Sequence, residues 1–365
     1  MSTFAPATLR DEKFMSRALL LAARGLYTTT PNPRVGCVIV NDGHIVGEGW
    51  HVNGGAAHAE VNALEQAGTR ALGGTLYVTL EPCAHFGQTP PCVEAIVQSG
   101  ISRVVFAAKD PNPLVDGRGL EHLIANGISV VGDLFSQKSE ELNVGFFKRM
   151  KSGKPWVRVK VAAGLDGKTA LENGRSQWIT SEESRVDAHK LRAQSCVVMT
   201  GVGTVVEDDP RLTVRHIETN RQPRKVIVDS RLRSPLDANL FKTSGVTLAT
   251  AVSKQDQLDP FIQKGINVLM LPDSEGRVDL DALLVELADQ QINEVLVEAG
   301  INLHSALLHQ NLIDEMIIYY APKFLGAQGR GMFFLDELDS MDQVLERNVV
   351  DITPIGKDFR VTVRF

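Results

Sequence analysis

The sequence predicts an α/β protein built from two domains. Its 365 residues exceed what a single hydrophobic core usually organises. Short apolar runs, typical of buried strands, alternate along the chain with segments whose apolar residues recur at helical spacing. A basic stretch containing glycine and proline, residues 148–155, interrupts this alternation before a new apolar run begins. We therefore expect one domain in residues 1–150 and a second in residues 151–365.

The first half begins with a predicted helix and a predicted hairpin. Residues 11–24 carry apolar side chains at helical spacing, and Gly25 follows as a stop signal. Two apolar runs, 35–40 and 45–50, flank an Asn-Asp-Gly sequence at 41–43, which is typical of a tight hairpin turn. Beyond the hairpin we expect a helix at 58–66, a strand at 75–79, a helix at 91–98, a strand at 103–107 and a helix at 136–150.

The second half continues the alternation of strands and helices. A first strand is expected at 156–162, and a helix is expected to follow Gly300 and to run to His309. No sequence repeat of short period is present, so a layered α/β domain is favoured over a repeat protein. The other predicted strands cover 197–200, 225–229, 246–251, 267–271, 294–298 and 316–321.

Composition narrows the functional class. The net charge of −6 disfavours a general nucleic-acid-binding protein, which would normally be basic. No apolar run is long enough to span a membrane, and residues 1–10 lack the apolar core of a signal peptide. Cys37 and Cys196 lie within apolar strand patterns and are expected in the core, which leaves no disulfide framework. We therefore expect a cytoplasmic protein without nucleic-acid or membrane partners.

Three short motifs supply the side chains of a metal site. His58 is followed two positions later by Glu60, and Glu81-Pro-Cys83 is followed by Pro-Cys92. One imidazole and two thiols leave the fourth position of a tetrahedral zinc ion open, as in catalytic sites. The pattern is similar to the H-x-E and P-C motifs of zinc-dependent nucleobase deaminases. Each residue alone would more often be an ordinary buried side chain. Together they predict one catalytic Zn²⁺ per chain.

Glu60 is the predicted proton carrier beside this metal. Zinc lowers the pKa of a bound water toward neutrality and so supplies a nucleophile. Glu60 would take the proton of this water, pass it to a ring nitrogen and help to protonate the departing ammonia. His85 could be a substrate contact, a group that orients a ligand, or a fourth ligand. We favour a substrate contact, because a zinc ion with four protein ligands could not activate water.

Five longer strings resemble those of one enzyme family. The sequence resembles the bifunctional riboflavin-biosynthesis deaminase/reductase family from about Asp11 to the C-terminus. Eight residues separate Cys83 from Cys92, whereas deaminases of tRNA or free cytidine typically have two residues between these cysteines. The strings are TPNPRVGCVIV at 30–40, EPCAHFGQTPPC at 81–92, DPNPLVDGRG at 110–119, QWITS at 177–181 and DDPRLT at 208–213.

The resemblance implies a deaminase in residues 1–150 with a cytidine-deaminase-like, three-layer fold. Its substrate would be 2,5-diamino-6-(5-phosphoribosylamino)pyrimidin-4-one. The family's functional positions fall on zinc ligands His58, Cys83 and Cys92, on the proton shuttle Glu60, and on Asn32, His51 and His85 as contacts to the pyrimidine or its ribose phosphate.

The residues of the second half alone give weaker signals. Gly201-Val-Gly203 follows an apolar strand, but Val206 stands where a dinucleotide-binding Rossmann motif needs its third glycine. Glu298-Ala-Gly300 lies at a strand-to-helix junction, where backbone N–H groups and the helix dipole could meet a phosphate. A simple tight turn would explain the same residues. The local sequence therefore leaves both interpretations open.

The resemblance adds a reductase in residues 151–365, with a dihydrofolate-reductase-like fold that binds NADPH. NADPH would reduce the ribosyl group of the deaminated intermediate to ribityl. Cofactor positions fall on Ala162, Trp178, Thr204, Asp208, Ser230, Gly300, Ile301, Asn302, Leu303, His304, Ser305 and Ala306, and substrate positions on Ser176, Arg192, Leu212, Arg215 and Glu298.

Several of these side chains suit the expected chemistry. Arg192 and Arg215 could bind a ribose-bound phosphate, although surface arginines are commonly only solvated. Ser230 could receive the 2′-phosphate that distinguishes NADPH from NADH. Lys160 and Asp208 are candidates for orienting or protonating the substrate during hydride transfer.

Two other functions are compatible with parts of this pattern. A deaminase could carry a second domain that binds substrate or a partner without reducing it. A zinc-stabilised binding protein could hold the same metal without catalysis, but it would not need Glu60 beside the ligands. We expect the two-step enzyme, acting as a homo-oligomer, either a dimer or a tetramer.

Overall fold

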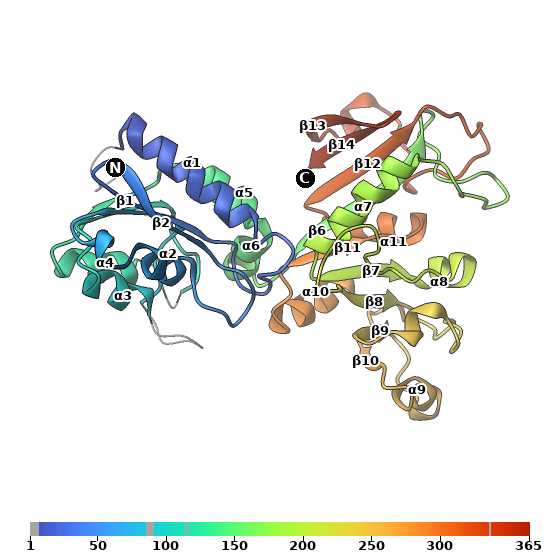
Figure 1. Cartoon of the computed structure of the whole chain (residues 1–365). Coiled ribbons are helices and arrows are strands. Elements are labelled where there is room, and N and C mark those ends of the chain that lie inside the picture. Colours follow the sequence, from blue (N-terminus) through green and yellow to red (C-terminus); the bar gives the residue numbers. More distant parts are fainter. Residues whose placement is uncertain (1–6, 85–90, 114, 116, 336) are drawn as a thin grey trace. The chain divides into compact units, whose positions relative to one another are not determined.

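The structure, a computed structural model, describes residues 7–84, 91–113, 115, 117–335 and 337–365. The chain divides into two compact units, residues 1–153 and 154–365, each built on its own sheet (Figure 1). The predicted α/β fold class is confirmed in both units. Residue 150, where we expected the boundary, lies inside helix α6 (Val144–Ser152), and the division follows this helix.

The first unit contains a mixed sheet of five strands in the order β2-β1-β3-β4-β5. The predicted hairpin pairs β1 with β2, and β1 also runs antiparallel to β3. The β3, β4 and β5 strands are parallel, so their carboxyl ends meet at one edge. The strands are β1 (Gly36–Asn41), β2 (His44–Trp50), β3 (Thr75–Leu80), β4 (Arg103–Ala108) and β5 (Ser129–Val131).

Helices cover both faces of this sheet and make three layers (Figure 1). On one face, Phe14 and Leu21 of α1 pack against strand residues such as Val38 and Tyr77. On the other face lie three helices whose apolar residues form a separate core cluster with the opposite sides of the same strands. The helices are α1 (Leu9–Ala23) and α5 (Ser136–Leu142) on the first face, and α2 (Ala59–Ala67), α3 (Cys92–Gln98) and α4 (Arg118–Ala125) on the second.

The prediction of one helix at 136–150 is wrong, because the chain forms α5 and α6 with a break at Asn143. Asn143 has φ −122° and ψ 24°, outside the helical region. Its side-chain oxygen accepts the backbone N–H of Arg34 at 2.7 Å, and its amide donates to the Arg34 carbonyl at 3.0 Å. The two hydrogen bonds of Asn143, the residue at the break, therefore hold in place the loop that leads into β1.

The second unit contains a sheet of nine strands in the order β10-β9-β8-β7-β11-β6-β12-β14-β13. The strands from β10 to β12 are parallel, whereas β14 and β13 form an antiparallel hairpin that the sequence did not predict. The strands are β6 (Trp156–Gly164), β7 (Val197–Gly201), β8 (Arg224–Val228), β9 (Val246–Thr250), β10 (Asn267–Met270), β11 (Glu294–Val297), β12 (Glu315–Ala321), β13 (Asn348–Ile355) and β14 (Asp358–Arg364).

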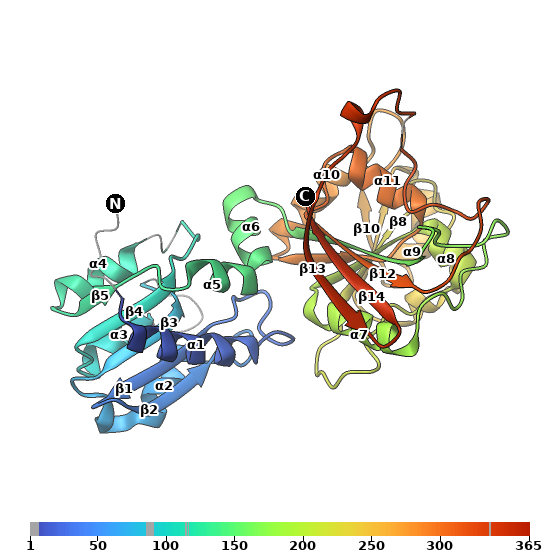
Figure 2. The same cartoon turned by 90° about the horizontal axis from the view of Figure 1, so that it is seen from above.

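Helices again lie on both faces of the sheet. Figure 2 shows α10 (Leu280–Asp289) and α11 (Ile301–His309) on the side opposite to α7 (Glu182–Gln194). Each side has its own core cluster, and α9 (Gln255–Ile262) belongs to the cluster of α7. The short helix α8 (Val202–Asp208) follows β7 directly. Because the strands are parallel, their carboxyl ends and the loops that follow form one edge, the usual place for a ligand in such sheets.

Candidate active sites

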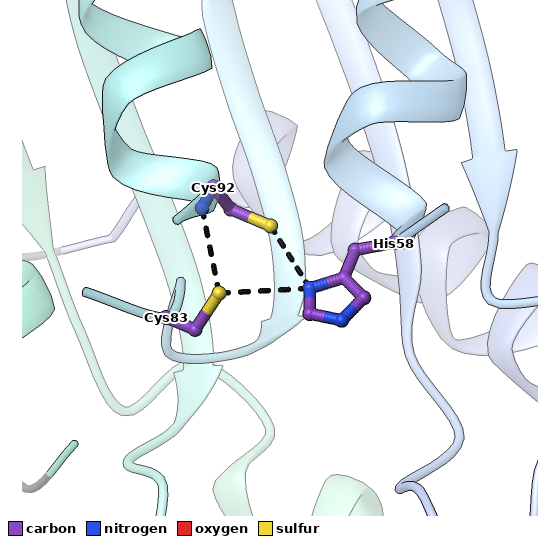
Figure 3. A group of neighbouring side chains, drawn as sticks. All are labelled: His58, Cys83 and Cys92. Carbon is purple, nitrogen blue, oxygen red and sulfur yellow. Dashed lines mark hydrogen bonds between the residues drawn. The ribbon is translucent and has the colours of Figure 1, made fainter. Parts of the chain in front are cut away.

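Three elements of the first unit bring the predicted metal ligands together. His58 occupies the N-cap position of α2, and Cys92 is the first residue of α3. Cys83 lies in the segment that follows β3. The ligand atoms of these side chains all lie within 4.8 Å of one another. Figure 3 shows that the three side chains point toward a common centre.

The imidazole of His58 faces both sulfurs through one nitrogen. Its Nδ1 lies 3.0 Å from Cys92 Sγ and 3.5 Å from Cys83 Sγ. The backbone N–H of Cys92 donates to Cys83 Sγ at 3.4 Å, as expected for a sulfur near a helix N-terminus. A metal held by these residues would therefore bind Nδ1 and the two sulfurs.

The protonation of the two cysteines indicates a place for a cation. The pKa of Cys83 is lowered because the side chain of Cys92 and the imidazole of His58 donate hydrogen bonds to its sulfur. The pKa of Cys92 is raised because its S–H is donated to Cys83 and because it is buried. Two thiolates this close repel each other unless a cation lies between them. One nitrogen and two sulfurs are ligands that zinc prefers, so these residues fit that ion.

Glu60 lies in the first turn of α2 and is 3% exposed. Burial, together with the charge on Cys83, raises the pKa of Glu60 to about 7. The same carboxyl contacts the side chain of Cys92 through a hydrogen bond. A carboxyl whose pKa is close to neutral can accept and release a proton at working pH, as a general acid–base requires.

Two of the three expected substrate contacts lie beside this cluster. The ring of His51 packs edge-on against His58, with 5.5 Å between ring centroids. Its Nε2 lies 3.0 Å from Nδ2 of Asn32, and its Nδ1 lies 3.2 Å from the Ala57 carbonyl oxygen. The structure therefore brings Asn32 and His51 together. His85 lies outside the described residues.

The second unit contains a cavity of about 670 Å³ at the carboxyl ends of β6, β7 and β11. This volume is in the usual range for small-molecule and cofactor sites. Fourteen of the expected cofactor and substrate residues line it, together with Lys160: Ala162, Ser176, Trp178, Arg192, Thr204, Asp208, Leu212, Arg215, Glu298, Gly300, Ile301, Asn302, Leu303 and His304.

Three expected cofactor residues are not among the lining residues of this cavity. Ser230 accepts the backbone N–H of Val278 through its hydroxyl at 3.0 Å. Ser305 donates to the Ile301 carbonyl at 2.6 Å, as a residue inside α11 can do. Ala306 packs against the core cluster below α11. Through these contacts the three residues support the structure around the cavity. Ser230 in particular does not line the cavity in this structure.

A buried charge cluster forms one wall of the cavity. Arg192 Nη2 donates to Glu298 Oε2 at 3.0 Å, and Arg192 Nη1 donates to the Thr213 carbonyl at 3.1 Å. Lys160 Nζ lies 3.6 Å from Glu298 Oε2. Burial alone would raise the pKa of Glu298, but Arg192 and Lys160 outweigh it and bring the pKa to about 2. Glu298 is therefore a fixed negative charge in a largely positive wall.

Two histidines of this wall were missed from the sequence. His189 accepts the backbone N–H of Arg215 at Nδ1, at 3.3 Å, and its ring packs 4.6 Å from that of His216. Burial and the charges of Arg192 and Arg215 lower the pKa of His189 to about 4. His189 and Arg192 are three positions apart on α7 and so share one helix face, a spacing that could have identified them.

The two remaining cysteines have no place in either site. Cys37 and Cys196 are buried, with exposures of 0% and 3%, and neither forms a disulfide. This agrees with their expected role as small core residues. Among the described residues, no helix is both long enough and apolar enough to cross a membrane.

Comparisons with known proteins agree with this arrangement of sites. The RibD C-terminal domain model matches residues 155–361, and the cytidine and deoxycytidylate deaminase zinc-binding region matches residues 9–108. The riboflavin biosynthesis protein RibD of Escherichia coli is 44% identical over 362 residues, covering 96% of this chain and 98% of that protein. The protein of the same name from Haemophilus influenzae is 42% identical over 365 residues, covering 97% of each.

Solved structures give the same result over the full length. Acinetobacter baumannii RibD, form 1, has a TM-score of 0.91 at 44% identity and covers 97% of this chain and 98% of its own. A diaminohydroxyphosphoribosylaminopyrimidine deaminase/5-amino-6-(5-phosphoribosylamino)uracil reductase of Thermotoga maritima has a TM-score of 0.86 at 33% identity, with the same coverage. The resemblance seen in the sequence is confirmed. The chain belongs to the RibD family and is a zinc-dependent deaminase and NADPH-dependent reductase of riboflavin biosynthesis.

Proposed function

We propose that residues 1–150 deaminate 2,5-diamino-6-(5-phosphoribosylamino)pyrimidin-4-one and that residues 151–365 reduce the ribosyl group of the product to ribityl. One observation carries this proposal. Three zinc-type ligands and a buried carboxyl meet in one unit, and a cofactor-sized cavity with a charged wall lies in the other. The two compact units and the two family matches support the same division. The Thermotoga maritima relative is named for both reactions.

In the deaminase site, we assign zinc binding to His58, Cys83 and Cys92. Zinc, when bound, polarises water for attack on the ring carbon that carries the amino group. Glu60 would then move two protons in turn. Its carboxylate would accept one from the attacking water and deliver it to the ring nitrogen, and it would then carry the proton of the new hydroxyl group to the amino group, which leaves as ammonia. The pKa of Glu60, raised to about 7 by burial, suits a group that must both accept and release a proton. Asn32 and His51 are placed to orient the pyrimidine.

In the reductase site, the residues of the chain bind and align the reactants. NADPH supplies the hydride that adds to C1 of the opened ribosyl group. Glu298, kept ionised, can accept hydrogen bonds from ribose hydroxyls, and Arg192 holds its orientation. Arg215 is exposed, and its Nη1 donates a hydrogen bond to Thr213 Oγ1 at 3.2 Å. The guanidinium of Arg192 is bound to the carboxylate of Glu298, whereas this bond of Arg215 is to a hydroxyl group. We therefore assign the substrate phosphate to Arg215 in preference to Arg192.

The remaining reductase assignments follow the cavity lining. The residues from Gly300 to His304 at the start of α11 and the residues Ala162, Trp178, Thr204 and Asp208 are assigned to NADPH, and Ser176 and Leu212 to the substrate. Ser230, Ser305 and Ala306, which do not line the cavity, are not assigned a direct contact with the cofactor. Lys160, 3.6 Å from Glu298, and Asp208, whose pKa is raised by burial, are the candidates for delivering a proton to the reduced substrate.

The test follows each reaction separately in one purified protein. We expect a zinc chelator to stop ammonia release from the diaminopyrimidinone. NADPH oxidation with 5-amino-6-(5-phosphoribosylamino)uracil should continue unchanged, because the described residues of the second unit form no cluster of metal ligands like that of the first. If NADPH is not consumed even when the deaminated compound is supplied, the second unit is a binding domain and not a reductase.

We also propose that the chain forms a homo-oligomer in the cytoplasm. Val349, Val350 and Ile352 on the edge strand β13 are each more than half exposed, at 56%, 54% and 62%, and an apolar edge strand favours pairing with another chain. The four cysteines, all within the described residues, form no disulfide, which supports a reducing compartment. Light scattering of the purified protein would distinguish a dimer or tetramer from a monomer.

A further inference from the structure

Glu81 is a conspicuous residue of the metal motif to which the proposed reaction gives no role. It directly follows β3 and lies two positions before Cys83. Its backbone N–H donates to the Ala108 carbonyl at 2.9 Å, which extends the pairing of β3 with β4. Its side chain is 3% exposed. A buried carboxylate without partners would be strongly destabilising, so its contacts need an explanation.

The partners of this carboxylate are backbone N–H groups at the start of helix α4 and one N–H, that of Asp110, in the segment that follows β4. Oε2 accepts from Asp110 at 3.4 Å and from Gly117 at 3.2 Å, and Oε1 accepts from Gly119 at 3.2 Å. Gly117 is the N-cap residue of α4 and has no side chain that could cap the helix. Glu81 therefore satisfies N–H groups that a capping side chain would otherwise bind, and its charge lies at the positive end of the helix dipole.

The first turn of α4 also presses directly on the segment between Glu81 and Cys83. A Cβ atom at Gly119 would lie only 2.0 Å from the carbonyl oxygen of Pro82 and 3.2 Å from Oε1 of Glu81. The backbone of Pro82 could not remain in place beside any larger residue at position 119. The helix start and the metal segment are thus in contact through both a hydrogen-bonded carboxylate and close backbone packing.

Cys83 is held from its other side by helix α3. The backbone N–H of Val93 donates to the Cys83 carbonyl at 3.3 Å, and the N–H of Cys92 donates to its sulfur at 3.4 Å. Without the Glu81 carboxylate, Cys83 would keep its contacts with α3 and His58, but the residues just before it would be tied to α4 only by the backbone packing of Pro82 on Gly119. The sulfur must be correctly placed for three ligands to close on one ion, because zinc sites need a defined tetrahedral geometry.

We propose that Glu81 is a positioning residue of the zinc site, which anchors Cys83 to the start of α4 and so slows the release of zinc. This role rests on the proposed assignment of His58, Cys83 and Cys92 as zinc ligands. The Glu81 carboxylate is bound to backbone N–H groups and is not part of the cluster of ligand atoms. It acts on the backbone that carries Cys83, as outer groups that orient metal ligands do.

The test measures how fast zinc leaves the full-length, zinc-loaded protein. Glu81→Gln keeps the size of the side chain but replaces one acceptor oxygen by an N–H₂ group facing backbone donors. Gly119→Ala disturbs the same contact from the helix side. Glu121→Gln is the matched control, since it makes the same change at an exposed position in the first turn of α4. Zinc transfer to the chromogenic chelator 4-(2-pyridylazo)resorcinol gives the rate. One zinc per chain at the start of the transfer reports that the first unit is folded, and NADPH oxidation with the deaminated substrate reports the same for the second unit.

We expect Glu81→Gln and Gly119→Ala to release zinc about 10-fold faster than wild type, with Glu121→Gln unchanged. Wild-type release from Glu81→Gln, even with a lowered unfolding midpoint, would overturn the proposal and leave Glu81 as a purely structural anchor. If Glu81→Gln does not fold, Gly119→Ala decides between the same two outcomes. A wild-type protein without zinc, or a Cys92→Ala variant that holds zinc as tightly as wild type, would contradict the zinc site itself and this role with it.

Discussion

The two candidate sites use the same residue type, a buried glutamate, in opposite electrostatic states. Glu60 has a pKa raised to about 7 by burial and by the charge of Cys83. Glu298 is also buried, yet Arg192 and Lys160 bring its pKa to about 2. A carboxyl near neutrality can transfer protons, whereas one held ionised can only orient and attract. On the proposed assignment, the deaminase site would therefore move protons through its buried glutamate, and the reductase site would use its buried glutamate as a fixed charge.

The sites also differ in how their residues are spread along the chain. The deaminase ligands come from one stretch between His58 and Cys92, because a metal needs a few side-chain atoms at fixed positions. The lining of the reductase cavity comes from segments between Lys160 and Met332. Such a cavity depends on backbone shape and on many weak contacts, so no short motif marks it. The first site can be read from a motif and the second only from the fold.

The largest expected effect tests the proton-transfer role of Glu60. We expect Glu60→Gln to reduce deamination by about 10²- to 10⁴-fold, because the amide cannot carry the proton. Zinc content, measured by elemental analysis, and NADPH oxidation with the deaminated substrate should stay at wild-type values. Deamination at the wild-type rate would mean that another group moves the proton.

The next largest effect, on stability, tests whether Arg192 stabilises the ionised carboxylate of Glu298. Arg192→Met leaves a buried carboxylate without its main partner, which typically costs about 3 kcal/mol of unfolding free energy. Arg277→Met is the control, because the ion pair of Arg277 with Asp273 is at the surface and 60% of the Arg277 side chain is exposed. Urea denaturation followed by tryptophan fluorescence compares the two. Equal costs for the two variants would show that Arg192 does not hold the charge of Glu298.

The difference between a site marked by a short motif and a cavity lined from many segments also explains which features the sequence could predict. The α/β class, most strands and the three side chains that meet in the metal-type cluster followed from periodicity and one motif. The helix α7 was not located, because it is largely polar and charged over Glu182–Gln194 and carries few apolar residues at helical spacing. Because α7 was not located, the three-residue spacing that places His189 and Arg192 on one helix face was not used, and the packing of His189 on His216 was missed.

Other elements were missed for local reasons. The strand β13 is mostly exposed, so it lacks the alternation of apolar and polar residues that predicts a half-buried strand. The helix α4 begins within the string at 110–119 and has a glycine N-cap, so the usual start signal is absent. Its cap is Glu81, far away in the sequence, and only the folded structure shows this contact.

A smaller effect concerns His304, a buried histidine of the cavity wall. Burial and the charge of Lys160 lower the pKa of His304 from 6.5 to about 4. The unfolded chain therefore binds a proton at a higher pH than the folded protein does, so stability present above pH 6.5 is lost as the pH falls toward 4. We expect His304→Phe to reduce the loss of unfolding free energy between about pH 7 and about pH 5 by about 2 kcal/mol.

Urea denaturation at a series of pH values measures this difference. His309→Gln is the control, since His309 lies at the exposed end of the same helix. The comparison uses the slope with pH and not the absolute stability, because phenylalanine also changes the packing. An unchanged slope in His304→Phe would mean that this imidazole does not stay neutral in the folded protein.

The smallest expected effect on stability decides between the two interpretations of Gly300. This residue has φ −88° and ψ 177°, which any residue can adopt, and a Cβ atom there would meet nothing within 4 Å. Gly300→Ala should therefore change the unfolding free energy by at most about 1 kcal/mol, the cost of a poorer N-cap. If the N-terminus of α11 receives a phosphate of NADPH, the added methyl group obstructs that approach, and the Kd for NADPH should rise about 10-fold. A fluorescence titration of NADPH measures this change. An unchanged Kd would instead make Gly300 a tight turn only, and the positive wall around Arg215 would remain as the anion-binding part of the cavity.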